Sequence, residues 1–362
     1  MVNLRTPGPT PCPDEVLQAL SWQMINHRGP EFQQMFSKIT ANLKKLFQTK
    51  NDVLLFTCSG TGGLETAVAN TLSPGDKVLW VTIGSFGDRF GEIARAFGAE
   101  AIPLRAELGK AADPDEIRKA LQAEPGIKAV LVTHNETATG VTNDLEAISA
   151  VVKGFDKLLL VDAISSLGSI NLPVDDWHCD VTVTASQKGW MAPPGLAMVS
   201  VGPEGWRAHA SAKMSRYNFD FTTAKEYADK GFTPWTPAVS IVFALSVSLE
   251  MMLKEGLQNI VARHAHIGNM VREGVKSLGL SLFADEKYAS NTVTAIAATN
   301  GLDVGKLMEI MRKEHQIVLS AGYGKLVGKI FRIGHLGGVA DSEIEEVMSA
   351  LKVALPRAGF VR

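Results

Sequence analysis

The sequence contains little cysteine, and its few cysteines form no recognisable pattern. Cys12, Cys58 and Cys179 are odd in number, far apart and without a C-x-x-C pair. Neither a disulfide framework nor a zinc site is therefore predicted, and no metal is expected. Because disulfides persist mainly in oxidising compartments, this cysteine usage favours the cytoplasm.

The sequence also lacks long apolar runs and an excess of one charge. The N-terminus, MVNLRTPGPTPCP, has no apolar segment of a signal peptide. The longest apolar helical pattern, Ile241–Leu253, is interrupted by Ser246, Ser248 and Glu250, so no membrane span is expected. The 36 Lys and Arg nearly balance the 38 Asp and Glu, for a net charge of −2. This balance gives no electrostatic reason to bind nucleic acid or an anionic membrane.

What the sequence does contain is an alternation of strand-like and helix-like runs. Short apolar runs typical of strands recur between helical patterns, at Val53–Cys58, Lys77–Thr82, Glu100–Leu104, Ala129–Thr133, Leu158–Val161, Val181–Ala185 and Leu196–Val201. This βα alternation predicts an α/β fold with a mostly parallel open sheet and helices on both faces.

Domain boundaries follow from where that alternation starts and stops. The proline-rich start of the chain cannot be a helix or a central strand, so we expect an extended N-terminal segment over residues 1–20. The large domain is expected over residues 21–255. After the long helix Ala238–Glu255 the pattern changes, which predicts a smaller C-terminal α+β domain over residues 256–362.

Three local predictions are specific enough to be tested. A helix is expected from Asp14 to Met24, because Pro13 stands directly before it. A second helix is expected over Gly91–Phe97, after a glycine-containing loop. Residues 219–231 are polar and are predicted to form a loop.

Two neighbouring strands each end on a chemically distinctive residue. Leu158–Val161 is followed by Asp162, and Val181–Ala185 is followed by Ser186-Gln187-Lys188-Gly189. Ligands bind at the carboxyl ends of strands in open α/β sheets. Pyridoxal phosphate needs a lysine for its Schiff base and a carboxylate that keeps the pyridine nitrogen protonated. A solvated lysine and a helix-capping aspartate are the alternative interpretation of the same pair.

A glycine-rich turn suits an anion. Ser59-Gly60-Thr61-Gly62-Gly63 lies between a predicted strand and a predicted helix. Exposed backbone amides and the positive end of the helix dipole would together attract an anion at this position. A nicotinamide-binding G-x-G-x-x-G motif would need glycine at Glu65, so a phosphate is favoured over a dinucleotide.

Two further residues are candidates for ligand contacts. Phe86, between Gly84 and Gly87, is suited to stack on a flat ring. Arg332 stands in an apolar strand and needs a partner, either an internal carboxylate or the α-carboxylate of an amino acid. His134 and Glu136 follow another strand and remain without a role.

Taken together, these motifs resemble class V of the fold-type I pyridoxal-phosphate aminotransferases, most closely the alanine–glyoxylate and serine–pyruvate group. The motifs TPGPT, SGTGG, HNETATG, LLLVDAISSLG, SQKG-x-x-APPG and FRIGHLG occur in the family's order and cover nearly the whole chain. The resemblance implies a ping-pong transfer of an amino group from a small amino acid to a 2-oxo acid. It also implies a homodimer whose sites are shared between two chains.

The resemblance assigns roles to individual positions. Lys188 matches the Schiff-base lysine, Asp162 the partner of the pyridine nitrogen, and Arg332 the substrate-carboxylate arginine. The remaining cofactor contacts that it implies fall on Thr61, Gly62, Gly63, Phe86, Thr137, Ile164, Gln187 and Thr236. Thr236 would reach the phosphate of the neighbouring subunit, with Thr233 as a rival for that contact.

Other interpretations remain. An aspartate-type aminotransferase, or a lyase or decarboxylase of the same fold, would use the same cofactor residues. A cysteine desulfurase would need a late nucleophilic cysteine, and none follows Cys179. A non-enzymatic subunit that retained the fold, such as one associated with a hydrogenase, would have no need to keep both Asp162 and Lys188.

Overall fold

A seven-stranded sheet forms the centre of the large domain in the computed structural model, which describes residues 2–362. The strand order is β2 (Asp52–Phe56), β10 (Ala197–Val201), β9 (Val181–Ala185), β8 (Leu158–Asp162), β5 (Ile127–Thr133), β3 (Lys77–Thr82) and β4 (Glu100–Arg105). Only β10 runs antiparallel to its neighbours. The predicted mostly parallel α/β sheet is confirmed, and the carboxyl ends of its six parallel strands share one edge.

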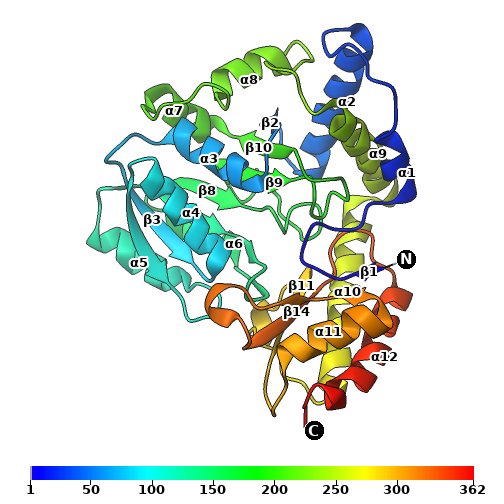
Figure 1. Cartoon of the computed structure of the whole chain (residues 1–362). Helices are drawn as coiled ribbons and strands as arrows, with labels where there is room; N and C mark the ends of the chain where they lie inside the picture. The colour runs from blue at the N-terminus through cyan, green and yellow to red at the C-terminus, as the bar shows by residue number, and fades with distance from the viewer. Residues whose placement is uncertain (1) are drawn as a thin grey trace.

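Helices cover both faces of this sheet because successive strand residues point to opposite sides. Leu54 and Trp80 pack toward one face, and Leu55 and Val81 toward the other. The first face is covered by α3 (Gly60–Thr71), α4 (Ser85–Ala96), α7 (Pro203–Ser211) and α8 (Phe221–Ala228). The second is covered by α2 (Pro30–Leu46), α5 (Pro114–Ala123), α6 (Leu145–Lys153) and α9 (Val239–Glu255). Figure 1 shows this layering around the central strands.

The C-terminal part has its own core beside the large sheet. It contains α10 (Leu257–Ser277), α11 (Val304–His315), α12 (Asp341–Arg357), and an antiparallel sheet of β11 (Val293–Ala297), β14 (Ile330–Gly334) and β13 (Ser320–Ala321). Short elements complete the chain: β6 (Asn135–Glu136), β7 (Val141–Thr142), β12 (Ile317–Val318) and the 3₁₀ turns Glu286–Tyr288 and Gly324–Leu326. Gly256, at a φ of 86°, joins α9 to α10.

The N-terminal segment connects the two parts. Its strand β1 (Asn3–Leu4) pairs in parallel with β12 of the C-terminal part. In Figure 1 the blue chain then crosses from there to α1 (Asp14–Ala19), which packs on α9. No described helix combines the length and apolarity needed to cross a membrane.

The three local predictions were each wrong in part. Helix α1 ends at Ala19, because Ser21 closes a turn with both its amide and its hydroxyl on the carbonyl of Gln18. Helix α4 begins at Ser85, six residues before the predicted start. Residues 221–228 form helix α8, whose first turn is capped by the carboxylate of Asp220.

Candidate active site

Asp162 is the last residue of β8 and is almost completely buried at the carboxyl edge of the sheet. Its Oδ1 accepts a hydrogen bond from the Ile164 amide at 2.9 Å, and its Oδ2 one from the Thr133 hydroxyl at 3.4 Å. Burial raises the pKa of this carboxyl to about 6, although these hydrogen bonds and the nearby charge of Lys188 oppose the rise. A cationic group facing Asp162 would hold it ionised.

Lys188 follows β9, the strand beside β8, so its side chain enters the same edge of the sheet. Burial lowers the pKa of the Lys188 ammonium to about 8, opposed by the charge of Asp162. Its Nζ donates to the Pro7 carbonyl at 2.5 Å. Such a lysine exchanges its proton near neutral pH, which suits a nucleophile and a base.

The N-terminal segment lies directly over Lys188. Thr10 donates its amide to the carbonyl of Gln187 at 3.0 Å and its hydroxyl to the carbonyl of Lys188 at 3.0 Å. Gly8 has a φ of 129°, and a Cβ at this position would stand 2.5 Å from Lys188 Nζ. A side chain at Gly8 would therefore displace the Lys188 side chain. The N-terminal segment thus covers the Lys188 ammonium group.

The first turn of α3 contains the glycine-rich motif. Ser59 caps it, accepting the Gly62 amide on its hydroxyl oxygen at 3.4 Å. A Cβ at Gly60 would come within 2.6 Å of Ile164 Cδ1, and one at Gly63 within 2.7 Å of Val183 Cγ1. The absence of side chains thus lets the first turn of α3 pack closely against Ile164, which follows β8, and against Val183 of β9.

Glu136 is the residue whose role sequence reasoning missed. It is completely buried, and its Oε2 accepts the amides of Phe86 at 2.8 Å and Gly87 at 3.0 Å, in the first turn of α4. Its Oε1 accepts the Ala138 amide at 2.9 Å. Burial raises the pKa of Glu136 to about 7. The carboxylate fixes the start of α4 and with it the position of Phe86; the glutamate in HNETATG was the available signal.

Arg332 reaches the same region from β14 of the C-terminal part. Its Nη1 donates to the Thr137 carbonyl at 2.8 Å, and its Nε and Nη2 donate to the Ala321 carbonyl at 3.1 and 2.8 Å. Arg332 is only 8% exposed and forms no ion pair among the described residues. No internal carboxylate therefore stands within ion-pair distance of the guanidinium; the more distant charge of Glu136 raises the pKa of Arg332, and burial lowers it by more.

The remaining predicted residues fall into two groups. Ile164 lies between Asp162 and Gly60, and Gln187 adjoins Lys188 with a buried Oε1 that has no hydrogen-bond partner. Thr236, in contrast, is exposed, and its hydroxyl lies 3.5 Å from His27 Nε2. Over residues 2–362, no hydrogen bond joins Thr236 to the other candidate site residues. The hydroxyl of Thr233 is taken by the Trp235 carbonyl.

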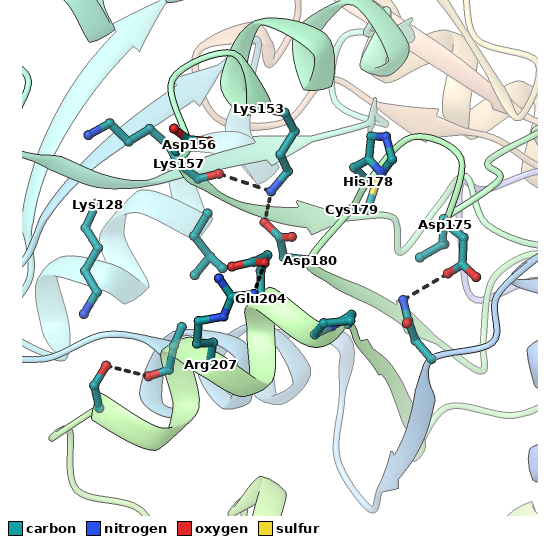
Figure 2. Close-up of a pocket in the computed structure, with 17 residues that line it drawn as sticks. Lys128, Lys153, Asp156, Lys157, Asp175, His178, Cys179, Asp180, Glu204 and Arg207 are labelled. Atoms are coloured by element: carbon teal, nitrogen blue, oxygen red, sulfur yellow. Dashed lines mark hydrogen bonds and ion pairs between the residues drawn. The ribbon is translucent and has the colours of Figure 1, made fainter.

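A large cleft of about 840 Å³ lies elsewhere, at the amino ends of the parallel strands. It is lined by residues that precede β8 and β9 or follow the antiparallel β10. Figure 2 shows two ion pairs among its charged side chains: Lys153 pairs with Asp180, and Arg207 with Glu204. Neither Asp162 nor Lys188 lines this cleft, so it is separate from the candidate active site at the carboxyl edge.

Comparison with known proteins places the chain in a family. Residues 2–332 match the model of the class-V aminotransferases. A soluble hydrogenase 42 kDa subunit from Anabaena cylindrica is 45% identical, with 98% of this chain and 94% of that protein covered. An L-aspartate–glyoxylate aminotransferase from Paracoccus denitrificans is 40% identical, covering 93% of this chain and 86% of its own length. The solved structure of an alanine–glyoxylate aminotransferase from Nostoc sp. superposes with a TM-score of 0.94 at 28% identity, covering 98% and 95% of the two chains.

The chain therefore belongs to the class-V aminotransferase family, and it is a pyridoxal-phosphate-dependent aminotransferase. The residues present fit this cofactor. A buried carboxylate and a lysine of lowered pKa stand at neighbouring strand ends, and the first turn of α3 packs against Ile164 and Ala185 next to them. The buried side-chain amide of Gln187, whose Oε1 has no hydrogen-bond partner, adds a polar group beside Lys188.

Proposed function

We propose that this enzyme transfers an amino group from a small amino acid, alanine or serine, to a 2-oxo acid such as glyoxylate or pyruvate by a ping-pong mechanism. The observation that carries the proposal is the pairing of Asp162 and Lys188 at adjacent strand ends, each with a pKa moved toward neutrality. A structural subunit would have no reason to bury two such groups together.

Each side chain has a defined task in this proposal. When bound, pyridoxal phosphate supplies a carbonyl that condenses with amines and a ring that accepts electrons. Asp162 would keep the ring nitrogen protonated, and Ile164 and Phe86 would contact the ring. Lys188 Nζ holds the cofactor and then moves the proton from the substrate's Cα. Thr61, Gly62, Gly63 and Gln187 bind the phosphate, and Thr137 binds the ring hydroxyl.

Arg332 supplies the grip on the substrate. Its guanidinium is buried, held in place by two backbone carbonyls and not neutralised by an acid. An α-carboxylate would compensate this charge in a two-point contact. Two loop arginines that could approach a second carboxylate are engaged elsewhere: Arg28 binds the carbonyls of Thr233 and Pro234, and Arg216 pairs with Asp220. This favours small donors.

The enzyme is proposed to act as a cytoplasmic homodimer. Thr236 is exposed and unconnected to the site of its own chain, which suits a contact with the phosphate in a second subunit. Large apolar side chains are exposed in the same part of the surface: Tyr217 at 78% stacks on Trp235 at 40%, with ring centroids 5.3 Å apart. Sedimentation of the purified protein tests the stoichiometry, and a monomer with full activity contradicts it.

Half-reactions test the substrate assignment. The cofactor-loaded protein is mixed with alanine, serine or aspartate, and its conversion to the aminated form is followed by absorbance; the acceptor is then tested with glyoxylate and pyruvate. Alanine or serine is expected to react fastest. Aspartate is the specific rival, because the Paracoccus relative is named for it. Faster conversion by aspartate overturns the small-donor proposal, and a product with carbon dioxide released overturns transamination itself.

Borohydride reduction provides a separate test of the lysine. Peptide mapping is expected to place the pyridoxyl group on Lys188. Label on another lysine contradicts the assignment without affecting the substrate question.

A further inference from the structure

Arg89 is a charged residue of the site that neither the sequence motifs nor the function above uses. It lies in α4, one turn after Ser85. Its Cζ lies 4.8 Å from the centroid of the Phe86 ring. Its Nη1 lies 3.5 Å from Thr61 Oγ1, in the first turn of α3. The guanidinium is thus placed between the aromatic ring and the glycine-rich helix end.

The charge of Arg89 is not compensated by the protein. The adjacent carboxylate, Asp88, turns away and binds Arg105 Nη1 at 2.5 Å and the Thr82 hydroxyl at 3.0 Å. Among the described residues no acid forms an ion pair with Arg89, and its one hydrogen bond is the long contact with Thr61. The half-buried guanidinium has five N–H donors and one weak hydrogen-bond partner, so most of its donors are available to an anion.

The neighbouring helix end needs such a cation. A phosphate monoester has a charge of about −1.5 to −2 at neutral pH. The N-terminus of α3 supplies the equivalent of roughly +0.5, and the hydroxyls of Ser59 and Thr61 are neutral. Lys188 and Arg332 are committed to the ring and to the substrate. The planar fork of Arg89 is the group within reach of Thr61 whose charge and geometry match a phosphate.

We propose that Arg89 binds the phosphate of the cofactor against the first turn of α3, supplying the positive charge that the helix end lacks. This inference rests on the proposed function, since it concerns the cofactor of that reaction. Arg89 also lowers the pKa of both Asp162 and Lys188, so its field extends over the whole site. Two rivals use the same side chain differently: support of the Phe86 ring, or binding of a second carboxylate on the amino-acid donor.

A comparison of two ligands separates these roles. Dissociation constants of pyridoxal phosphate and of pyridoxal, which lacks the phosphate, are measured by absorbance with cofactor-free protein. Arg89→Gln is expected to weaken pyridoxal phosphate about 10- to 100-fold, the range of a charge-assisted hydrogen bond, and to leave pyridoxal unchanged. Arg89→Lys is expected to restore part of the loss. The matched control is Arg105→Gln, a nearby arginine paired with Asp88, which is expected to change neither constant.

Inorganic phosphate gives a second readout that needs no catalysis. It is expected to raise the melting temperature of the cofactor-free wild type, and to do so less in Arg89→Gln. Equal losses for pyridoxal and pyridoxal phosphate would assign Arg89 to the ring instead. Unchanged cofactor affinity with a selective loss of aspartate conversion would assign it to the substrate. If the wild type itself binds no pyridoxal phosphate, the proposed function fails and this inference with it.

Discussion

Asp162 acquires its properties from two opposing effects at a single residue. Burial raises its pKa, while hydrogen bonds and the charge of Lys188 lower it, for a value of about 6. Reciprocally, Asp162 raises the pKa of Lys188. The two groups are therefore tuned together, and a change at one is measurable at the other.

Asp162→Asn tests this coupling. Loss of the charge is expected to reduce turnover about 10²–10³-fold, as when one group that stabilises developing charge is removed. Because the carboxylate raises the Lys188 pKa above what burial alone would give, the midpoint of the pH profile for cofactor loading is expected to move below its wild-type position near pH 8. Stopped-flow absorbance measures both. Near-normal turnover, or a midpoint that moves upward, contradicts the role of Asp162.

Arg332→Lys tests the substrate grip. Lysine keeps the charge but cannot contact both oxygens of a carboxylate in a plane, so KM for every amino acid is expected to rise together, by about 10-fold or more. Arg357→Lys is the control, because Arg357 makes the same two-point contact with the exposed Glu314 far from the site. A KM increase confined to one donor would place Arg332 on the side chain of the substrate.

At the scale of the element, the sequence predicted the strands better than the helix ends. The seven strands were recoverable because each is a short, largely apolar run between helical patterns, and Asp162 and Lys188 could be placed because both follow buried runs of this kind. The start of α4 could not be predicted, because the acceptor for its first amides is Glu136, about 50 residues away in sequence. Helix α8 was missed because it buries only Phe221 and Ala224, too few apolar residues for a visible period.

Glu136→Gln tests how α4 is fixed. The amide NH₂ of glutamine would face backbone donors, so at least one of the three amides is expected to lose its acceptor, at a cost of about 1–3 kcal/mol. Displacement of Phe86 is expected to weaken pyridoxal and pyridoxal phosphate equally, unlike substitution of Arg89. Thermal melting and absorbance titration measure the two effects. The control is Glu146→Gln, which changes an exposed glutamate in the first turn of α6. If both variants behave alike, the hydrogen bonds from the α4 amides to Glu136 do not fix the start of that helix.

At the scale of the whole molecule, the active site depends on both parts of the chain. The segment after β1 leaves the C-terminal part, passes over Lys188 at Pro7 and Gly8, and is bound to the lysine loop through Thr10. Arg332 enters from the C-terminal part and is bound to Thr137 of the large domain. Packing of the two parts against each other therefore sets the distance between Arg332 and Lys188.

Four buried histidines, His134, His209, His264 and His335, make the stability of the molecule sensitive to acid. Burial lowers the pKa of His134 and His264 to about 4 and that of His335 to about 3, from the ordinary 6.5. Below pH 6.5 these histidines bind protons in the unfolded chain but stay neutral in the folded protein. The free energy of unfolding therefore falls as the pH drops from 6.5 toward 4. Asp162 and Glu136 act in the opposite direction, because their pKa values are raised and the folded state gains protons between pH 7 and 4.

Urea denaturation of the cofactor-free protein at several pH values measures the balance. Burial also lowers the pKa of His209 and raises that of Asp180. The four histidines with a lowered pKa therefore outnumber the three carboxyls with a raised one, so a net loss of stability is expected on acidification from pH 6.5 to 4. Each histidine contributes a slope of about 1.4 kcal/mol per pH unit where only the unfolded chain is protonated. His335→Asn keeps a donor for the Asn291 carbonyl and is expected to reduce the slope by about that amount, whatever it does to the stability at pH 7. An unchanged slope in this variant would mean that His335 is protonated equally in the folded and unfolded states, which its burial between β14 and β11 is expected to prevent.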